Sequence, residues 1–286
     1  MTSHDLVDEA RKIFKVRRIG HGGTLDPGAS GILPLAIGKA TRLFEYLEEA
    51  KKTYRGEITF GAVTSTQDAQ GNLIEKKDAS QVTQERIEAL LPQFMGEVEQ
   101  IPPQVSAIRH QGKRSYEWER AGVVVPLTPR KVRIDRIVFR EFFPGVFPKA
   151  ILDVWSGPGM YMRALARDLG EALGSGAHLS FLVRLESTPF GLSEAHTIEE
   201  VRKKATEGGL ESILVGGEKA LPHIPKVSIS EQQKLLLLRG SRLPMESPLV
   251  GKPLVQLYDE EEDLVALGRI EGSKKPYFFQ PVKIFD

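Results

Sequence analysis

Gly20-His21-Gly22-Gly23-Thr24-Leu25-Asp26-Pro27-Gly28-Ala29-Ser30-Gly31 is the stretch that decides how this chain is interpreted. Glycine permits backbone conformations that other residues resist, and proline holds the residue before it in an extended conformation. We therefore expect residues 17–31 to form a loop that presents the carboxylate of Asp26 and the imidazole of His21 in fixed positions. Taken alone, however, the stretch favours a plain turn-rich connector in which Asp26 bonds its own backbone.

The same region does not match three other kinds of site. A Walker phosphate loop requires Gly-Lys followed by Ser or Thr, whereas Gly38-Lys39 is followed by Ala40. The six histidines are scattered and no His-Glu-x-x-His occurs, so a metal site has no support. No Gly-x-Ser-x-Gly elbow for a serine nucleophile is present.

Hydrophobic periodicity predicts regular elements on both sides of this loop. A helix is expected over 5–16 and a second over 39–49. Residues 52–60 alternate, with Tyr54, Gly56, Ile58 and Phe60 on one face, which indicates a half-buried strand. Residues 68–72 have the composition of a turn.

Further along the chain, capping residues and strand patterns continue the series. Thr83 can cap a helix that runs to about residue 94, and a helix is expected from Tyr161 to Leu173, closed by Gly174. Thr197 with Glu200 has capping-box spacing, as has Ser230 with Gln233. Strands are expected over 131–142, 149–156, 253–258, 264–270 and 276–284. Residues 101–130 lack a clear period and are basic, which predicts a long functional surface segment.

Composition indicates a soluble globular protein of one large domain, or of one domain with a small appendage. The chain has 286 residues, of which 41% are hydrophobic and 27% charged. With no cysteine, disulfides, thiolate zinc sites and cysteine nucleophiles are excluded. The absence of a long apolar run and of a basic-then-apolar leader predicts a cytoplasmic protein without a membrane segment.

Charge does not by itself point to a nucleic acid. The net charge is +1, and the basic residues gather in local clusters. Solvated surface charge is the interpretation that composition alone favours, whereas clusters brought onto one face could bind phosphates. The clusters are Arg11-Lys12-Lys15-Arg17-Arg18, Lys51-Lys52-Arg55, Arg109-His110-Lys113-Arg114 and Arg130-Lys131-Arg133.

A series of motifs in one order and spacing carries a family resemblance. The stretch from Gly20 to Gly31 resembles that of the bacterial tRNA pseudouridine synthase B family, which modifies uridine 55 in the T-loop of tRNA. Each motif is weak alone, but together they span nearly the whole chain. The others are Gly38-Lys39-Ala40-Thr41-Arg42, Lys52-Thr53-Tyr54, Asp68-Ala69-Gln70-Gly71, Gln100-Ile101-Pro102-Pro103, Gly112-Lys113-Arg114, Gly159-Met160-Tyr161-Met162-Arg163, Gly174-Ser175-Gly176-Ala177-His178-Leu179 and Leu182-Val183-Arg184-Leu185.

The resemblance implies an α+β fold with two domains. It implies a mixed, largely antiparallel sheet with flanking helices over residues 1–223, the pseudouridine synthase fold. Residues 101–130 would be an insertion that clasps RNA. Residues 226–286 resemble, more loosely, a small C-terminal β domain of the PUA type that contacts RNA.

The resemblance also implies roles for individual residues. Asp26 matches the catalytic aspartate and Arg163 the arginine that pairs with it and lowers its pKa. Tyr54 matches the aromatic residue that stacks on the target base and assists removal of the C5 proton. The remaining matches are to substrate- or RNA-binding positions: His21 fills the space left by the everted uridine, Tyr161 and Leu182 line the pocket, and Lys113 and Arg114 lie in the insertion.

The reaction implied is the isomerisation of uridine to pseudouridine in a T-arm stem-loop by a monomeric enzyme without cofactor or metal. The carboxylate either attacks C1′ or takes the C2′ proton, and the sequence leaves both open. Two other functions stay open: a catalytic subunit that depends on a guide RNA, and an RNA-binding protein without catalysis.

Overall fold

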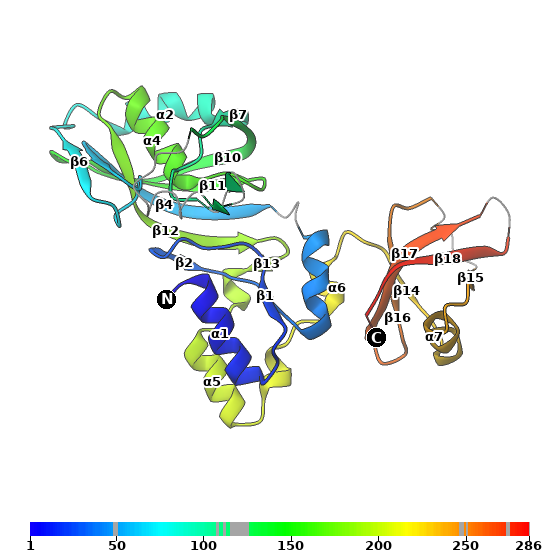
Figure 1. Cartoon of the computed structure of the whole chain (residues 1–286). Helices are drawn as coiled ribbons and strands as arrows, with labels where there is room; N and C mark the ends of the chain where they lie inside the picture. The colour runs from blue at the N-terminus through cyan, green and yellow to red at the C-terminus, as the bar shows by residue number, and fades with distance from the viewer. Residues whose placement is uncertain are drawn as a thin grey trace. The chain divides into compact units, whose positions relative to one another are not determined.

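The computed structural model describes residues 1–47, 51–106, 109–110, 113–114, 126–245, 249, 251–272 and 275–285, with the side chains of 109–110 and 113–114 left out. This described part of the chain divides into two compact units (Figure 1). Unit 1 comprises Met1–Ser3, Gly23–Leu33 and Glu49–Ala195. Unit 2 comprises His4–Gly22, Pro34–Glu48 and His196–Asp286. The loop around Asp26 thus belongs to unit 1, whereas His21 belongs to unit 2.

A seven-stranded sheet forms the centre of unit 1. Its order is β13-β12-β4-β11-β10-β7, with β2 paired to β12 off this path. The β2–β12 pairing is parallel and the others are antiparallel, so the sheet is mixed and largely antiparallel as expected. The strands are β2 (Ala29–Gly31), β4 (Lys52–Phe60), β7 (Gly96–Gln100), β10 (Arg130–Phe143), β11 (Lys149–Ser156), β12 (Ala177–Ser187) and β13 (Phe190–Gly191).

Helices cover one face of this sheet (Figure 1). Helix α4 (Met162–Ala172) packs on β4 and β12, and α2 (Gln84–Leu90) lies beside α4. Gly56 allows the close approach, because a Cβ there would lie 2.7 Å from Cε of Met162. The buried core between helices and sheet includes Ile58, Leu152 and Leu165, which are fully buried. The predicted alternation of residues 52–60 and the helix after Tyr161 are therefore confirmed.

Shorter elements complete unit 1. Thr83 accepts a hydrogen bond from the backbone N–H of Arg86 and caps α2, as predicted. The hairpin β5–β6 follows β4, and the two-residue strands β8 and β9 pair with each other. The other parts of the basic segment 101–130, at 107–108, 111–112 and 115–125, lie outside the described residues. These elements are β5 (Ala62–Thr64), β6 (Leu73–Lys76), η2 (Leu91–Phe94), β8 (Arg109–His110), β9 (Lys113–Arg114) and η3 (Leu192–Glu194).

Among the described residues of unit 2, two buried clusters stand out. Helix α1 (Ser3–Phe14) packs Val7 and Ala10 against Ile19 of β1 (Ile19–His21), which pairs with β3 (Leu35–Ile37). The second cluster lies in the five-stranded sheet β14-β16-β17-β18-β15 with helix α7. The remaining elements are η1 (Gly38–Tyr46), α5 (Ile198–Thr206), η4 (Leu210–Ile213), α6 (Gly217–Ala220), β14 (Lys226–Ser228), α7 (Glu231–Leu238), β15 (Leu243–Met245), β16 (Val255–Tyr258), β17 (Leu264–Glu271) and β18 (Tyr277–Ile284).

Three sequence expectations are corrected. Residues 17–31 are not all loop, because they contain β1 and β2. Residues 38–46 form a 3₁₀ helix in which only Leu43 is buried; the helix expected over 39–49 begins there, and its last two residues lie outside the described part of the chain. Strand β12 was missed because two register shifts interrupt its alternation, and because Arg184 is buried while Phe181 is exposed.

Candidate active site

Hydrogen bonds anchor the backbone of the loop that carries Asp26 on both sides of the aspartate. The backbone N–H of Leu25 donates to Oγ of Ser3 at 2.9 Å, and that hydroxyl donates to the carbonyl of Leu25 at 3.2 Å. The N–H of Ala29 donates to the carbonyl of Asp26 at 2.9 Å. These bonds close a turn at Asp26-Pro27, so the aspartate is presented from a fixed backbone.

Gly31 brings the end of this loop against β12. Its φ of +103° lies in the region that favours glycine. A Cβ at this position would lie 2.2 Å from the carbonyl oxygen of Arg184. The parallel pairing of β2 with β12, which places Ala29 opposite Leu182, therefore requires glycine at position 31.

Arg163 binds the carboxylate of Asp26 with two nitrogens. Nη2 donates to Oδ1 at 2.9 Å, and Nε lies 2.8 Å from Oδ2. The arginine lies in the first turn of α4, and its side chain is only 3% exposed, whereas that of Asp26 is 36% exposed. This two-pronged geometry fixes the orientation of the carboxylate as well as its position.

The guanidinium of Arg163 is itself held by other groups. Nη1 donates to the carbonyl of Thr66 at 3.2 Å and Nη2 to that of Val105 at 2.9 Å. The carboxylate of Asp68 lies 3.6 Å from Nε. Since every one of these partners is an acceptor, the arginine is locked between the Asp26 loop and the 66–68 loop.

Asp68 is positioned by a loop that is bonded to β12. The backbone of Leu179 donates to Gln67 at 3.0 Å and accepts from Ala69 at 3.1 Å. Gln67, at φ +63°, turns the chain so that the Asp68 carboxylate also accepts from the N–H of Gln70 at 2.9 Å. Thus β12 supports both loops that bring carboxylates to Arg163.

The pKa of Asp26 is raised above its ordinary value, and burial is the main cause. Arg163 pulls this pKa down, and the negative charge of Asp68 pushes it up. Arg163 thus acts on the pKa in the predicted direction, but desolvation of the carboxylate is the larger effect and raises the pKa overall.

Tyr54 and Leu182 come from neighbouring strands of the sheet. On β4, Tyr54 lies between Val154 of β11 and Arg184 of β12. Leu182 is buried, on β12. Burial raises the pKa of the Tyr54 phenol, and the Asp26 charge adds to that rise, so phenol and carboxylate interact electrostatically.

Tyr161 precedes α4 and is held by a side chain of β7. Its N–H donates to Oε1 of Gln100 at 3.1 Å, and Nε2 of Gln100 donates back to its carbonyl at 3.3 Å. Burial raises the pKa of the Tyr161 phenol, and Asp26 contributes to the rise. The structure thus gathers Asp26, Arg163, Tyr54, Tyr161 and Leu182 in unit 1.

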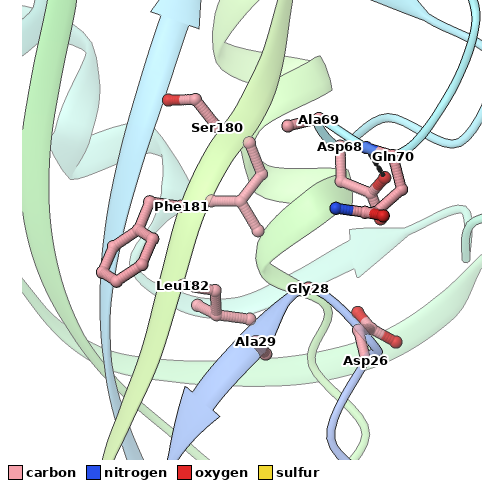
Figure 2. A pocket seen from close by; sticks show the side chains of 10 residues that line it. Asp26, Gly28, Ala29, Asp68, Ala69, Gln70, Ser180, Phe181 and Leu182 are labelled. Carbon is pink, nitrogen blue, oxygen red and sulfur yellow. Dashed lines mark hydrogen bonds between the residues drawn. The ribbon is translucent and has the colours of Figure 1, made fainter. Parts of the chain in front are cut away.

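A pocket opens beside this group of residues (Figure 2). Asp26, Gly28 and Ala29 lie on one side of it, and Asp68, Ala69 and Gln70 on another. Figure 2 shows β12 crossing the pocket, with Leu182 on the side of Asp26 and the ring of Phe181 turned away from it. The wall therefore combines two carboxylates with an apolar strand.

Three further residues were predicted to bind the substrate or RNA: His21, Lys113 and Arg114. His21 lies in β1 and belongs to unit 2, whereas Asp26 belongs to unit 1. Lys113 and Arg114 form strand β9, but their side chains lie outside the description. Their roles remain predictions.

Two residues of the site were missed in the sequence. Asp68 was noted only as part of a turn and motif. Arg184, 1% exposed, was quoted only as part of a motif, although a charged residue in the apolar run Leu182-Val183-Arg184-Leu185 was the signal to follow.

The described residues lack two kinds of feature. No group of three or more His, Asp or Glu side chains in that part of the chain could hold a metal ion. None of the helices in it has the length and apolar character to cross a membrane.

Family comparisons assign both parts of the chain. The family described as "TruB family pseudouridylate synthase (N terminal domain)" matches residues 11–162. That described as "tRNA pseudouridylate synthase B C-terminal domain" matches residues 163–250. Together the two matches span most of the chain.

Similar curated proteins carry one name. The tRNA pseudouridine synthase B of Geobacillus thermodenitrificans is 38% identical over 291 aligned positions, covering 100% of this chain and 96% of that protein. The protein of the same name from Symbiobacterium thermophilum is 45% identical, covering 84% of this chain and 78% of its own length.

Solved structures have the same fold. A chain of "Crystal Structure of a Cbf5-Nop10-Gar1 Complex" superposes with a TM-score of 0.71 at 27% identity, covering 100% of this chain and 82% of that one. A chain of "Structure of H/ACA RNP bound to a substrate RNA containing 2'-deoxyuridine" gives a TM-score of 0.72 at 25% identity, with 100% and 82% covered.

Proposed function

Since the chain belongs to the TruB family of pseudouridylate synthases, we propose that it isomerises uridine 55 in the T-loop of tRNA with Asp26 as the catalytic carboxylate. Pseudouridine synthesis on tRNA is the activity of the family. The target position and the role of Asp26 are our additions. The observation that carries them is the ion pair of Arg163 with Asp26, whose carboxylate lines the pocket.

The chemistry requires an oriented, ionised carboxylate next to the ribose. Isomerisation breaks the C1′–N1 bond, turns the uracil and rejoins it through C5, with no atom gained or lost, so we propose no cofactor. Arg163 supports the ionised form of Asp26 against the effect of burial. Attack on C1′ and removal of the C2′ proton are both compatible with the 36% exposure of Asp26.

The target base must leave the folded T-loop to reach Asp26. Proteins that act on a base extrude it and compensate part of the cost by stacking. Tyr54 and Tyr161 provide aromatic side chains near Asp26, and Leu182 provides an apolar one on the pocket wall. We propose that these three residues receive the everted uridine and that His21 fills the space it leaves.

The remainder of the tRNA would be held by basic surface residues. We propose that residues 1–223 form the catalytic domain, with Lys113 and Arg114 of the 101–130 segment contacting phosphates. Residues 226–286 would form a second RNA-binding domain, a PUA-like one. Phosphate contacts make affinity fall as the salt concentration rises. We further propose a monomer in the cytoplasm.

The decisive experiment measures release of the C5 hydrogen from a T-arm stem-loop. The purified chain, Asp26→Asn and Asp78→Asn are compared on a bare transcript labelled at C5 of the target uridine. Asp78 is an exposed carboxylate on the surface and serves as the matched control. We expect wild type and Asp78→Asn to release the label, and Asp26→Asn to bind RNA without releasing it.

Other outcomes contradict the proposal in distinguishable ways. Turnover by Asp26→Asn removes the role of that carboxylate. RNA binding without release by wild type indicates a guide-dependent subunit if added guide RNA and partner proteins restore release, and a binding protein if they do not. Release from a uridine outside the T-loop overturns the proposed position.

A further inference from the structure

Arg184 is a buried cation that the proposed chemistry does not use. It is 1% exposed, with Nε donating to the carbonyl of Ile32 at 2.8 Å and Nη2 to that of Gly23 at 3.1 Å. Within the described residues no carboxylate forms an ion pair with it. A buried charge without a counter-charge is costly, and its retention calls for a reason.

Tyr54 is a further partner of Arg184 among the described residues. The two residues lie directly opposite each other in the β4–β12 ladder, and charge interaction and hydrogen bonding of the guanidinium with the phenol lower the pKa of Tyr54 against the effect of burial. Arginine has only donors, so the phenol oxygen is the acceptor in this bond. The proton of the phenol is then left to be donated to another group, on the side where Asp26 and Tyr161 interact with Tyr54.

We propose that Arg184 is a positioning residue that holds Tyr54 as a hydrogen-bond donor to the target nucleotide. The acceptor would be an oxygen of the everted uridine. This inference rests on the proposed function, because it takes Tyr54 to contact that nucleotide. Arg184 acts only through the phenol oxygen and does not itself reach the substrate.

A purely structural role for Arg184 predicts a different result. The carbonyls of Gly23 and Ile32 flank the Asp26 loop, so loss of Arg184 could also disturb the catalytic carboxylate. A double-mutant cycle separates the two routes, because coupled residues give non-additive losses. If Arg184 acts through Tyr54, replacement of Arg184 lowers the reaction rate only while the phenol hydroxyl of Tyr54 is present.

The first experiment measures single-turnover rates on the T-arm stem-loop for wild type, Arg184→Lys, Tyr54→Phe and the double variant. We expect Arg184→Lys to lower the rate about tenfold, equivalent to about 1.4 kcal/mol, in the presence of Tyr54 and by less than about twofold in Tyr54→Phe. Equal losses in both backgrounds overturn the inference in favour of the structural role.

The second experiment needs neither RNA nor turnover, so its failure is distinct from failure of the proposed function. Ionisation of Tyr54 is followed by phenolate absorbance, as the difference between each protein and its Tyr54→Phe counterpart. Arg184 draws the pKa of Tyr54 down, whereas burial, Asp26 and Tyr161 raise it. Arg184→Gln should therefore raise the pKa of Tyr54 further.

Arg55→Gln is the matched control for this titration. Arg55 is the next residue to Tyr54 on β4, but its guanidinium bonds Asp153 at 2.7 and 2.8 Å. We expect its replacement to leave the titration of Tyr54 unchanged. A pKa of Tyr54 that does not rise in Arg184→Gln, or that rises equally in Arg55→Gln, overturns the inference.

Discussion

Asp26 and Asp68 share one nitrogen of a single arginine. Nε of Arg163 lies 2.8 Å from Oδ2 of Asp26 and 3.6 Å from Oδ2 of Asp68. Two carboxylates around one guanidinium make the charge of each depend on the other, and Asp68 accordingly raises the pKa of Asp26. The more buried of the two, Asp68, can therefore tune the pH at which Asp26 is ionised.

Asp68→Asn should shift the acid limb of the pH–rate profile to lower pH. Catalysis requires ionised Asp26, so the rate falls as pH falls through the pKa of that carboxyl. Removal of the Asp68 charge lowers the pKa of Asp26, and the fall in rate moves down with it. Single-turnover rates across the acidic range measure this shift. Asp78→Asn serves as control, and a shift to higher pH contradicts the arrangement.

Gly31→Ala should disrupt the β2–β12 contact that carries the Asp26 loop. The new Cβ meets a backbone oxygen and the residue keeps a positive φ, so we expect a loss in free energy of unfolding of roughly 3 kcal/mol or more. Gly96→Ala is the control: its φ is +86° but no atom lies within 4 Å of its Cβ, so the cost is about 1 kcal/mol from strain alone. Urea unfolding measures the free energy of unfolding of both variants. Equal losses in the two variants would show that the structure relieves the clash at position 31.

Asp153→Asn should destabilise the sheet without altering the chemistry at Asp26. Asp153 is 1% exposed and binds Arg55 and, at 2.6 Å, Arg140. Because both arginines are nearly half exposed, we expect a loss of only about 2 kcal/mol at neutral pH. The more exposed Asp135, paired with Arg133, gives a control variant, Asp135→Asn, with a loss below about 1 kcal/mol.

The pH dependence of that loss has a definite sign. The arginines hold the pKa of Asp153 below its ordinary value despite burial. The stabilisation is therefore fully present above the unfolded-state pKa and is lost as pH falls through the lower folded-state pKa. Urea unfolding at a series of pH values should show the difference between wild type and Asp153→Asn shrinking in acid. A constant difference contradicts the ion-pair explanation.

Local sequence patterns predicted the elements that pack in a regular way. Strand β4 has the predicted bounds because its alternation matches one covered face, and α2 begins at the predicted cap Thr83. Strand β12 escaped detection because its buried positions include an arginine and its exposed positions a phenylalanine. A buried arginine and an exposed phenylalanine depend on contacts with distant segments. Hydrophobic periodicity along the strand does not reveal those contacts.

The site was predictable only in part, because some of its interactions join residues that are far apart in the sequence. Asp26 stands out in the sequence because glycine and proline restrict the chain around it. Its pairing with Arg163 was inferred from a resemblance, since the two residues are 137 positions apart. The net rise in the pKa of Asp26 was not predicted, because burial of a carboxyl depends on all the segments around it.

The sequence by itself determined the family, the glycine loop that presents Asp26, and the regular elements whose apolar spacing matches a single buried face. Only the tertiary structure decided that Asp68 approaches the same guanidinium as Asp26 and that Arg184 is buried against Tyr54. The physical reason is range. Backbone preference and side-chain spacing act between neighbours in the chain, whereas desolvation and charge interactions depend on which distant segments the fold brings together.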